Sequence, residues 1–179
     1  MDIAVERELT VVPFDEQFAA AFKALFPGIR RLLDRSSGDP QAADDLAQEA
    51  FIRLYRRGSL PDSPAAWLAT VALNLFRNEY ASRRRRLRLL TTAAGERAHS
   101  DPGASPAERA EAADLRDRVR VAMDQLSERD QGLLLLRAEG YTYRDMATAL
   151  DLHEASIGTL LVRAKREFLR RYGEGTDAH

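Results

Sequence analysis

The chain has 179 residues, of which 45% are hydrophobic and 31% charged, and its formal net charge is −1. This composition is typical of a globular protein and excludes an intrinsically disordered chain. No apolar run approaches the roughly 18 residues that a membrane span needs, so we expect no membrane insertion. Cysteine is absent, which excludes disulfides, thiolate nucleophiles and cysteine-based metal sites. With no basic leader sequence at the N-terminus, the expected location is cytoplasmic.

Charge is segregated along the chain although it nearly cancels overall. Residues 39–49 contain four acids and no base, whereas residues 77–88 contain six arginines and one acid. A protein that held DNA purely by neutralising phosphates would usually be basic overall. The segregation therefore predicts two different partners, one for each charged segment.

The N-terminal half predicts three helices, because apolar residues recur at intervals of three and four and strand-like alternation is absent. The first covers residues 14–33. Asp39 and Pro40 form an N-cap with proline at the first helical position, and the second helix runs from there to about residue 57. Ser63 and Pro64 begin a third helix that continues through the arginine run. The expected buried stripe of the second helix is Leu46, Ala50, Phe51, Leu54 and Tyr55, and that of the third is Trp67, Leu68, Val71, Leu75 and Phe76.

Residues 91–104 are rich in small and polar residues and carry no long apolar stripe, which indicates a linker. The chain is therefore expected to be all-α, with two small helical domains, residues 1–87 and 105–179, joined by a flexible linker over residues 88–104. Residues 105–108 form a capping box that begins a fourth helix. Ser127 begins a fifth helix, which Gly140 ends. Thr142 opens a short helix that ends near Leu150, and a last helix covers residues 154–172.

The short helix, the tight turn and the last helix together predict a helix-turn-helix. Seven residues are expected to point inward: Met146, Ala147, Leu150, Leu152, Ile157, Leu161 and Ala164. In this motif the N-terminal part of the second helix enters the major groove. Candidate contacts to DNA are Glu154, Ser156, Thr159, Arg163, Lys165 and Arg166. The uncharged residues Gly158 and Leu160 predict few direct base contacts. Two helices packed only for stability are the structural alternative.

A second candidate surface for nucleic acid lies on the third helix. Asparagine can form hydrogen bonds with base edges, and arginine can pair with phosphates or stack on bases. The residues concerned are Asn74, Arg77, Asn78, Arg83, Arg84, Arg85 and Arg86. They predict a surface for a DNA strand drawn out of its stack. A solvated helix end, whose arginines complement the helix dipole, is the alternative.

Three segments together resemble the sigma-70 family, specifically its extracytoplasmic-function (ECF) group. They are residues 44–55 (DDLAQEAFIRLY), residues 66–74 (AWLATVALN) with the arginine run after them, and the helix-turn-helix within residues 126–169. The resemblance covers nearly the whole chain, in the right order. It implies an alternative sigma factor that docks on core RNA polymerase through Asp44, Asp45, Gln48, Glu49 and Phe51.

The resemblance further implies that Asn74 and the arginine run bind the minus-ten element of promoter DNA, and that the last helix binds the minus-thirty-five element. The loop over residues 56–62 would set which minus-ten base is accepted, and residues 88–104 would thread the RNA exit path. An anti-sigma factor is an implied further partner. Many relatives carry lysine or arginine where this chain has Gly158 and Leu160. Residues 1–13 have no role that the family supplies.

Two other classes of function stay open. A helix-turn-helix regulator that binds operator DNA without core polymerase would explain residues 126–172, but not the acidic helix or the arginine run. An enzyme is not expected, and neither a cofactor nor a metal is implied. His99, His153 and His179 are scattered in the linker, the turn and the tail, and no glycine-rich phosphate loop is present. A purely structural helical bundle is the third possibility.

Overall fold

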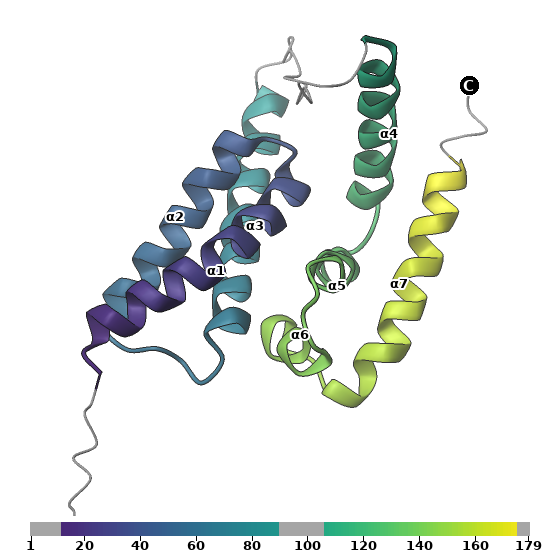
Figure 1. Ribbon diagram of the computed structural model, residues 1–179. Coiled ribbons are helices and arrows are strands. Elements are labelled where there is room, and N and C mark those ends of the chain that lie inside the picture. The colour runs from purple at the N-terminus through teal and green to yellow at the C-terminus, as the bar shows by residue number, and fades with distance from the viewer. Residues whose placement is uncertain (1–11, 90–105, 175–179) are drawn as a thin grey trace, which may run out of the picture.

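The structure, a computed structural model, describes residues 12–89 and 106–174, and these form seven α-helices and no strand (Figure 1). The helices are α1 (Phe14–Ser37), α2 (Pro40–Arg57), α3 (Pro64–Leu89), α4 (Pro106–Asp124), α5 (Glu128–Ala138), α6 (Tyr143–Leu150) and α7 (Glu154–Glu174). The all-α prediction is confirmed. The predicted linker lies outside the described residues, except for its first two residues, which extend α3. Residues 1–11 of the N-terminal segment and residues 175–179 of the tail also lie outside them.

The helix starts follow the predicted capping residues. The Asp39 carboxylate accepts hydrogen bonds from the backbone N–H groups of Gln41 (3.1 Å) and Ala42 (3.2 Å). The hydroxyls of Ser127 and Thr142 cap α5 and α6 in the same way. Each cap gives a partner to backbone donors that the first helical turn leaves unpaired. Helix α7 ends two residues later than predicted, because Gly173 is accommodated in its last turn.

The three N-terminal helices pack around a small-residue seam on α2. Ala43, Ala47 and Ala50 of this helix are fully buried, which lets α1 and α3 approach closely. The predicted burial of Ala50, Phe51 and Leu54 is confirmed, and Leu46 is half-buried. The predicted burial of Tyr55 is wrong, because its side chain is 52% exposed. Its ring packs against the Phe18 ring at the edge of the α1–α2 interface, and its hydroxyl donates to Asp15 near solvent.

The C-terminal helices form the predicted helix-turn-helix from α6 and α7, supported by α5. Met146, Ile157 and Ala164 are fully buried and Ala147 nearly so, while Leu150, Leu152 and Leu161 are half-buried against the core. All seven residues therefore point inward, as predicted. Helix α4 runs beside α7, where the Arg118 guanidinium lies 4.8 Å from the centre of the Tyr172 ring.

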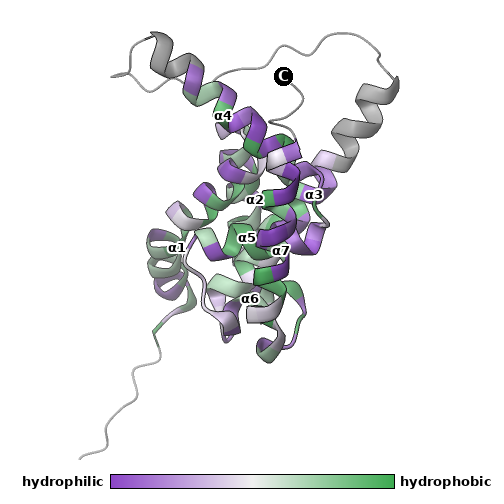
Figure 2. Cartoon of the chain, turned by 90° about the vertical axis from the view of Figure 1, so that its right-hand side faces the viewer, coloured by the Kyte–Doolittle hydropathy of each residue, from purple (hydrophilic) through white to green (hydrophobic). Residues whose placement is uncertain are grey.

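The two sets of helices are in contact. The apolar cluster that begins between α1, α2 and α3 continues into α5, α6 and α7, where it includes Leu133, Leu136 and Met146. Helix α6 packs against α3, and α5 packs against α1. Figure 2 shows the hydrophobic residues of α5 at the centre of the molecule. Among the described residues, no helix is long and apolar enough to cross a membrane.

Candidate nucleic-acid and protein interfaces

The five residues expected on the acidic surface of α2 take three different positions. Asp45 and Gln48 are exposed, and Glu49 has a side chain that is 38% exposed and binds Arg53 on the next turn at 2.9 Å. These three residues define what we call the acidic face. Phe51, with 2% of its surface exposed, lies beneath the face and supports it.

Asp44 is turned toward α1 rather than toward the acidic face. Its carboxylate accepts hydrogen bonds from Nε (2.5 Å) and Nη2 (3.4 Å) of Arg30. The bond to this carboxylate raises the pKa of Arg30 above its usual value. The pair joins α1 to α2, so Asp44 holds the helix that carries the acidic face.

Thr70, Asn74 and Arg77 lie on one side of α3, because they are spaced four and three residues apart. We call this side the polar face of α3. Asn74 is exposed, and its amide oxygen accepts a hydrogen bond from Nη1 of Arg77 at 3.2 Å. Asn78 is exposed on the adjoining side. Residues 83–86 continue the same helix, but their side chains lie outside the described part of the chain.

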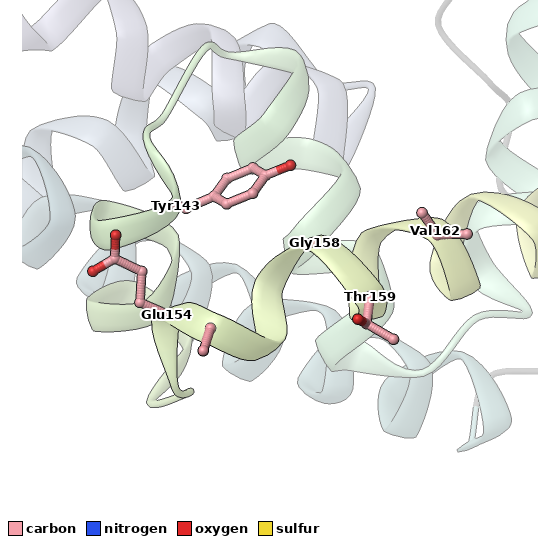
Figure 3. Close-up of a pocket in the computed structure, with 6 residues that line it drawn as sticks. Tyr143, Glu154, Gly158, Thr159 and Val162 are labelled. Atoms are coloured by element: carbon pink, nitrogen blue, oxygen red, sulfur yellow. The ribbon is translucent and has the colours of Figure 1, made fainter.

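The start of α7 forms one side of an open groove of about 710 Å³ (Figure 3). The lining residues are Tyr143 from α6 and Glu154, Ala155, Gly158, Thr159 and Val162 from α7. Of the predicted DNA contacts, Glu154 and Thr159 line this α7 groove, while Ser156 is exposed beside it. Arg163, Lys165 and Arg166 are exposed on the following turn.

The two uncharged residues Gly158 and Leu160 of α7 have different positions relative to the groove. A Cβ atom at Gly158 would lie 3.6 Å from Cε2 of Tyr143, so glycine gives the groove its width beside this ring. Leu160 is half-buried against the core and does not line the groove.

Two residues were missed by sequence reasoning. Tyr143 is 43% exposed over the groove, but a tyrosine in the first turn of a short helix has no distinctive pattern. Asp130 is 8% exposed, and its carboxylate lies 3.6 Å from Nη2 of Arg163. Asp130 therefore keeps the guanidinium of Arg163, which is expected to contact a DNA phosphate, close to α5. In the sequence, the one indication of a role for Asp130 is its position in the first helical turn after the Ser127 cap.

Comparison with known proteins agrees with this arrangement. The family described as Sigma-70 region 2 matches residues 21–86, which span α1 to α3. The family described as Sigma-70, region 4, matches residues 116–168 and includes the helix-turn-helix.

Two curated relatives match most of the chain in sequence. One is the ECF RNA polymerase sigma factor EcfG of Rhodopseudomonas palustris (strain TIE-1), 30% identical over 87% of this chain and 83% of the relative. The other is the RNA polymerase sigma-H factor of Pseudomonas aeruginosa (strain PAO1), 33% identical over 75% of each chain. The chain therefore belongs to the sigma-70 family, as an alternative sigma factor of its extracytoplasmic-function group.

A solved structure has the same fold. It is the sigma factor RpoE from Bartonella quintana, in complex with the anti-sigma factor NepR. The likeness has a TM-score of 0.63 at 20% identity and covers 87% of this chain and 96% of that one.

Proposed function

We propose that three separate surfaces of this chain carry its function as a sigma factor. The acidic face of α2 docks on core RNA polymerase, the polar face of α3 and the arginines after it hold the minus-ten strand, and the α7 groove receives the minus-thirty-five element. The observation that carries the proposal is that Asp45, Gln48 and Glu49 point outward from α2 and take no part in the packing of α1, α2 and α3. Asp44 and Phe51, in contrast, hold these three helices together.

The acidic face suits a basic helical partner that also offers an apolar contact. Ile52 is 43% exposed and lies one turn beyond Gln48 on the same side of α2. A buried apolar centre with a charged rim is the usual anatomy of a specific protein interface. The carboxylates would mainly speed and orient the encounter, and Ile52 would exclude water from its centre.

The DNA surfaces divide into one for an unpaired strand and one for a duplex. Unstacking a base costs on the order of a few kcal/mol, and contacts from Asn74 and neighbouring arginines would offset that cost. In the α7 groove, Thr159 can form a hydrogen bond with a base edge, and the apolar surface of Val162 and Ala155 suits a thymine methyl group. The loop over residues 56–62 stays a candidate for selecting the minus-ten base.

The charge balance indicates that this protein needs core polymerase for specific binding. Counterion release from DNA scales with the phosphates that a protein neutralises, and the net charge here is −1. The proposed site of action is therefore the holoenzyme in the cytoplasm. The chain acts there by binding, without catalysis, with residues 1–87 and 105–179 as its two domains and residues 88–104 as the connection. An anti-sigma factor is a further candidate partner.

The test is capture of purified core RNA polymerase by the immobilised chain. We expect the wild type to retain polymerase and the charge-reversed variant Asp45→Arg/Glu49→Arg to lose it, because like charges would then face each other. Asp114→Arg/Asp117→Arg is the matched control, since both residues are exposed on α4, a different helix from the one that carries the acidic face. It should bind as the wild type does.

Failure of the wild type to bind core would reject the sigma-factor mechanism for this chain in favour of operator binding alone. Equal losses in the two variants would assign the effect to overall charge rather than to the acidic face.

A further inference from the structure

We propose that Asp130 is a positioning residue for promoter recognition, which holds the guanidinium of Arg163 so that this arginine reads a guanine of the minus-thirty-five element rather than neutralising a phosphate. The inference rests on the proposed function, because it takes the α7 groove as the surface for that element. It adds a base and a supporting residue, both of which the proposed function leaves open.

Asp130 is the one polar or charged residue that is buried among the residues that the structure describes. It lies in the first turn of α5, where its backbone N–H donates to the Ser127 hydroxyl at 3.2 Å. Nothing in the described part of the chain donates a hydrogen bond to its Oδ1 atom. A buried carboxylate oxygen without a hydrogen bond costs stability, so folding alone does not account for an aspartate at this position.

Two arginines flank this carboxylate without closing on it. Nε of Arg129 lies 3.5 Å from Oδ1 of Asp130, and Nη2 of Arg163 lies 3.6 Å from the same atom. Both separations exceed the range of about 2.7–2.9 Å that is usual for charge-assisted N–H···O bonds. Arg129 precedes Asp130 on α5, whereas Arg163 comes from α7 and has a side chain that is 56% exposed. The buried carboxylate is thus paired with an arginine that projects from the second helix of the helix-turn-helix.

Arg163 lies at the end of the α7 groove. It follows Val162 directly and comes one turn after Thr159, and both of these residues line the groove. Arg163 and Asp130 together line a smaller polar pocket of about 350 Å³ on the neighbouring surface. In the proposed complex, the guanidinium would therefore lie beside the base pairs that occupy the groove.

A second acid lies four residues further along α7, but other arginines engage it. The Glu167 carboxylate accepts hydrogen bonds from Nη2 of Arg170 at 2.5 Å and from Nε of Arg171 at 2.8 Å. These hydrogen bonds, that of Arg170 first, lower the pKa of Glu167 to about 2. The spacing of Arg163 and Glu167 would ordinarily favour an ion pair on one helix. With Glu167 occupied in this way, the ion pair of Arg163 is the one with Asp130.

The fixed negative charge of Asp130 favours a base edge over a phosphate as the partner of Arg163. A phosphate carries a full negative charge, so docking it on Arg163 would bring it close to the Asp130 carboxylate, and the two would repel each other. The O6 and N7 atoms of guanine carry only partial charges, and arginine binds this pair of acceptors with two N–H groups. While one N–H group is directed at Asp130, others of the same guanidinium remain available for such an edge.

Restraint of Arg163 also lowers the cost of binding DNA. An arginine side chain has several rotatable bonds, whose freedom is lost when the guanidinium is fixed against a base. Asp130 removes part of that freedom in advance, because its carboxylate is buried where α5 packs against α7. Closure of the pair from 3.6 Å to about 2.9 Å would give the carboxylate its missing hydrogen bond. Binding of guanine should therefore depend on the charge of Asp130.

The test measures how the holoenzyme binds DNA that the wild-type holoenzyme has selected from a random-sequence library. Each guanine of the selected minus-thirty-five element is replaced in turn by 7-deazaguanine, which has a C–H group in place of the N7 acceptor. We expect one replacement to weaken binding of the wild type about tenfold, because it removes half of a bidentate contact. The same replacement should leave binding of Arg163→Ala unchanged. A selected element without guanine, or equal losses in both proteins, would overturn the inference.

Asp130→Asn keeps the shape of the side chain and removes its charge. We expect this variant to bind unmodified DNA about fivefold more weakly and to bind the sensitive 7-deazaguanine DNA as the wild type does. In the Arg163→Ala background it should have no further effect, because Asp130 acts through Arg163. Equal losses on the two DNAs would show that Asp130 only supports the fold, and an additive loss in the double variant would likewise reject the positioning role.

Glu128→Gln is the matched control, because it also converts a carboxylate to an amide in the first turn of α5. The Glu128 side chain is 75% exposed and lies 3.5 Å from Nε of Arg77 on α3, so its charge is paired away from α7. The ratio of its affinities for the two DNAs should equal that of the wild type. A ratio that falls as far as in Asp130→Asn would assign the effect to the charge of α5 and overturn the inference.

The salt dependence of binding separates a base contact from a phosphate contact. Loss of one phosphate contact lowers the slope of log K against log salt concentration by about 0.9. We expect Arg163→Ala to keep the slope of the wild type, and a decrease of that size would refute the base contact. A wild type that fails to bind core polymerase would instead overturn the proposed function, and the role of Asp130 with it.

Discussion

Val162 gives the sharpest test of the α7 groove, because its contribution can be separated from charge. Its side chain is 60% exposed in the free protein. Truncation to alanine removes two methyl groups, worth about 0.8 kcal/mol each when fully buried. Covering the exposed part against a thymine methyl group should therefore contribute about 1 kcal/mol, or about fivefold in affinity.

The measurement is binding of the holoenzyme to DNA that the wild-type holoenzyme has selected from a random-sequence library. This DNA carries either thymine or uracil in the minus-thirty-five element. Uracil lacks only the C5 methyl group, so it removes the proposed contact and keeps the hydrogen-bonding pattern. We expect Val162→Ala to weaken binding to thymine DNA about fivefold and to change uracil DNA little. Val121→Ala, similarly exposed on α4, is the control. A penalty that is equal on both DNAs would refute the contact.

Two further predictions concern the fold. Asp39→Ala should cost about 1 kcal/mol, because it removes the N-cap of α2, and should lower Tm by about 2–4 °C in calorimetry; no shift relative to the exposed-loop control Asp62→Ala would contradict the capping role. Burial, and secondarily the charge of Glu139, raises the pKa of Tyr141 to about 12 from 10.0. Because the pKa of Tyr141 is higher in the folded than in the unfolded chain, the folded chain holds the phenol proton more tightly. The stability that this supplies is complete below pH 10 and is lost as pH rises through about 12. The ultraviolet titration of the wild type minus that of Tyr141→Phe should have its midpoint near 12, and a midpoint near 10 would argue against burial as the cause.

Local features of the fold were predictable because each depends on a few neighbouring residues. The caps at Asp39, Ser127 and Thr142 follow from side-chain oxygens placed two or three residues before free backbone N–H groups. The inward face of the helix-turn-helix follows from periodicity alone. Tyr55 was misplaced because periodicity gives the direction of a side chain but not where the covering helix ends.

For the candidate surfaces, the sequence predicted which residues to consider but not which other residues they contact. Sequence spacing placed Asp44 beside Asp45, yet only the packing of α1 shows that Asp44 binds Arg30. Likewise, Arg77 and Glu128 lie 51 residues apart, and no local rule joins them. Contacts between the two sets of helices depend on tertiary packing, and the sequence left open whether they pack at all.

Gly158 has a consequence for how the promoter preference of such a protein can change over generations. The groove owes its width there to a missing side chain, with the Tyr143 ring 3.6 Å from where a Cβ atom would be. A single substitution at this position would reshape the groove that we propose receives the minus-thirty-five element, while the buried helix-turn-helix core beneath stays untouched. Under this proposal, the DNA sequence preference and the stability of the fold depend on different positions of one helix, so each can change without the other.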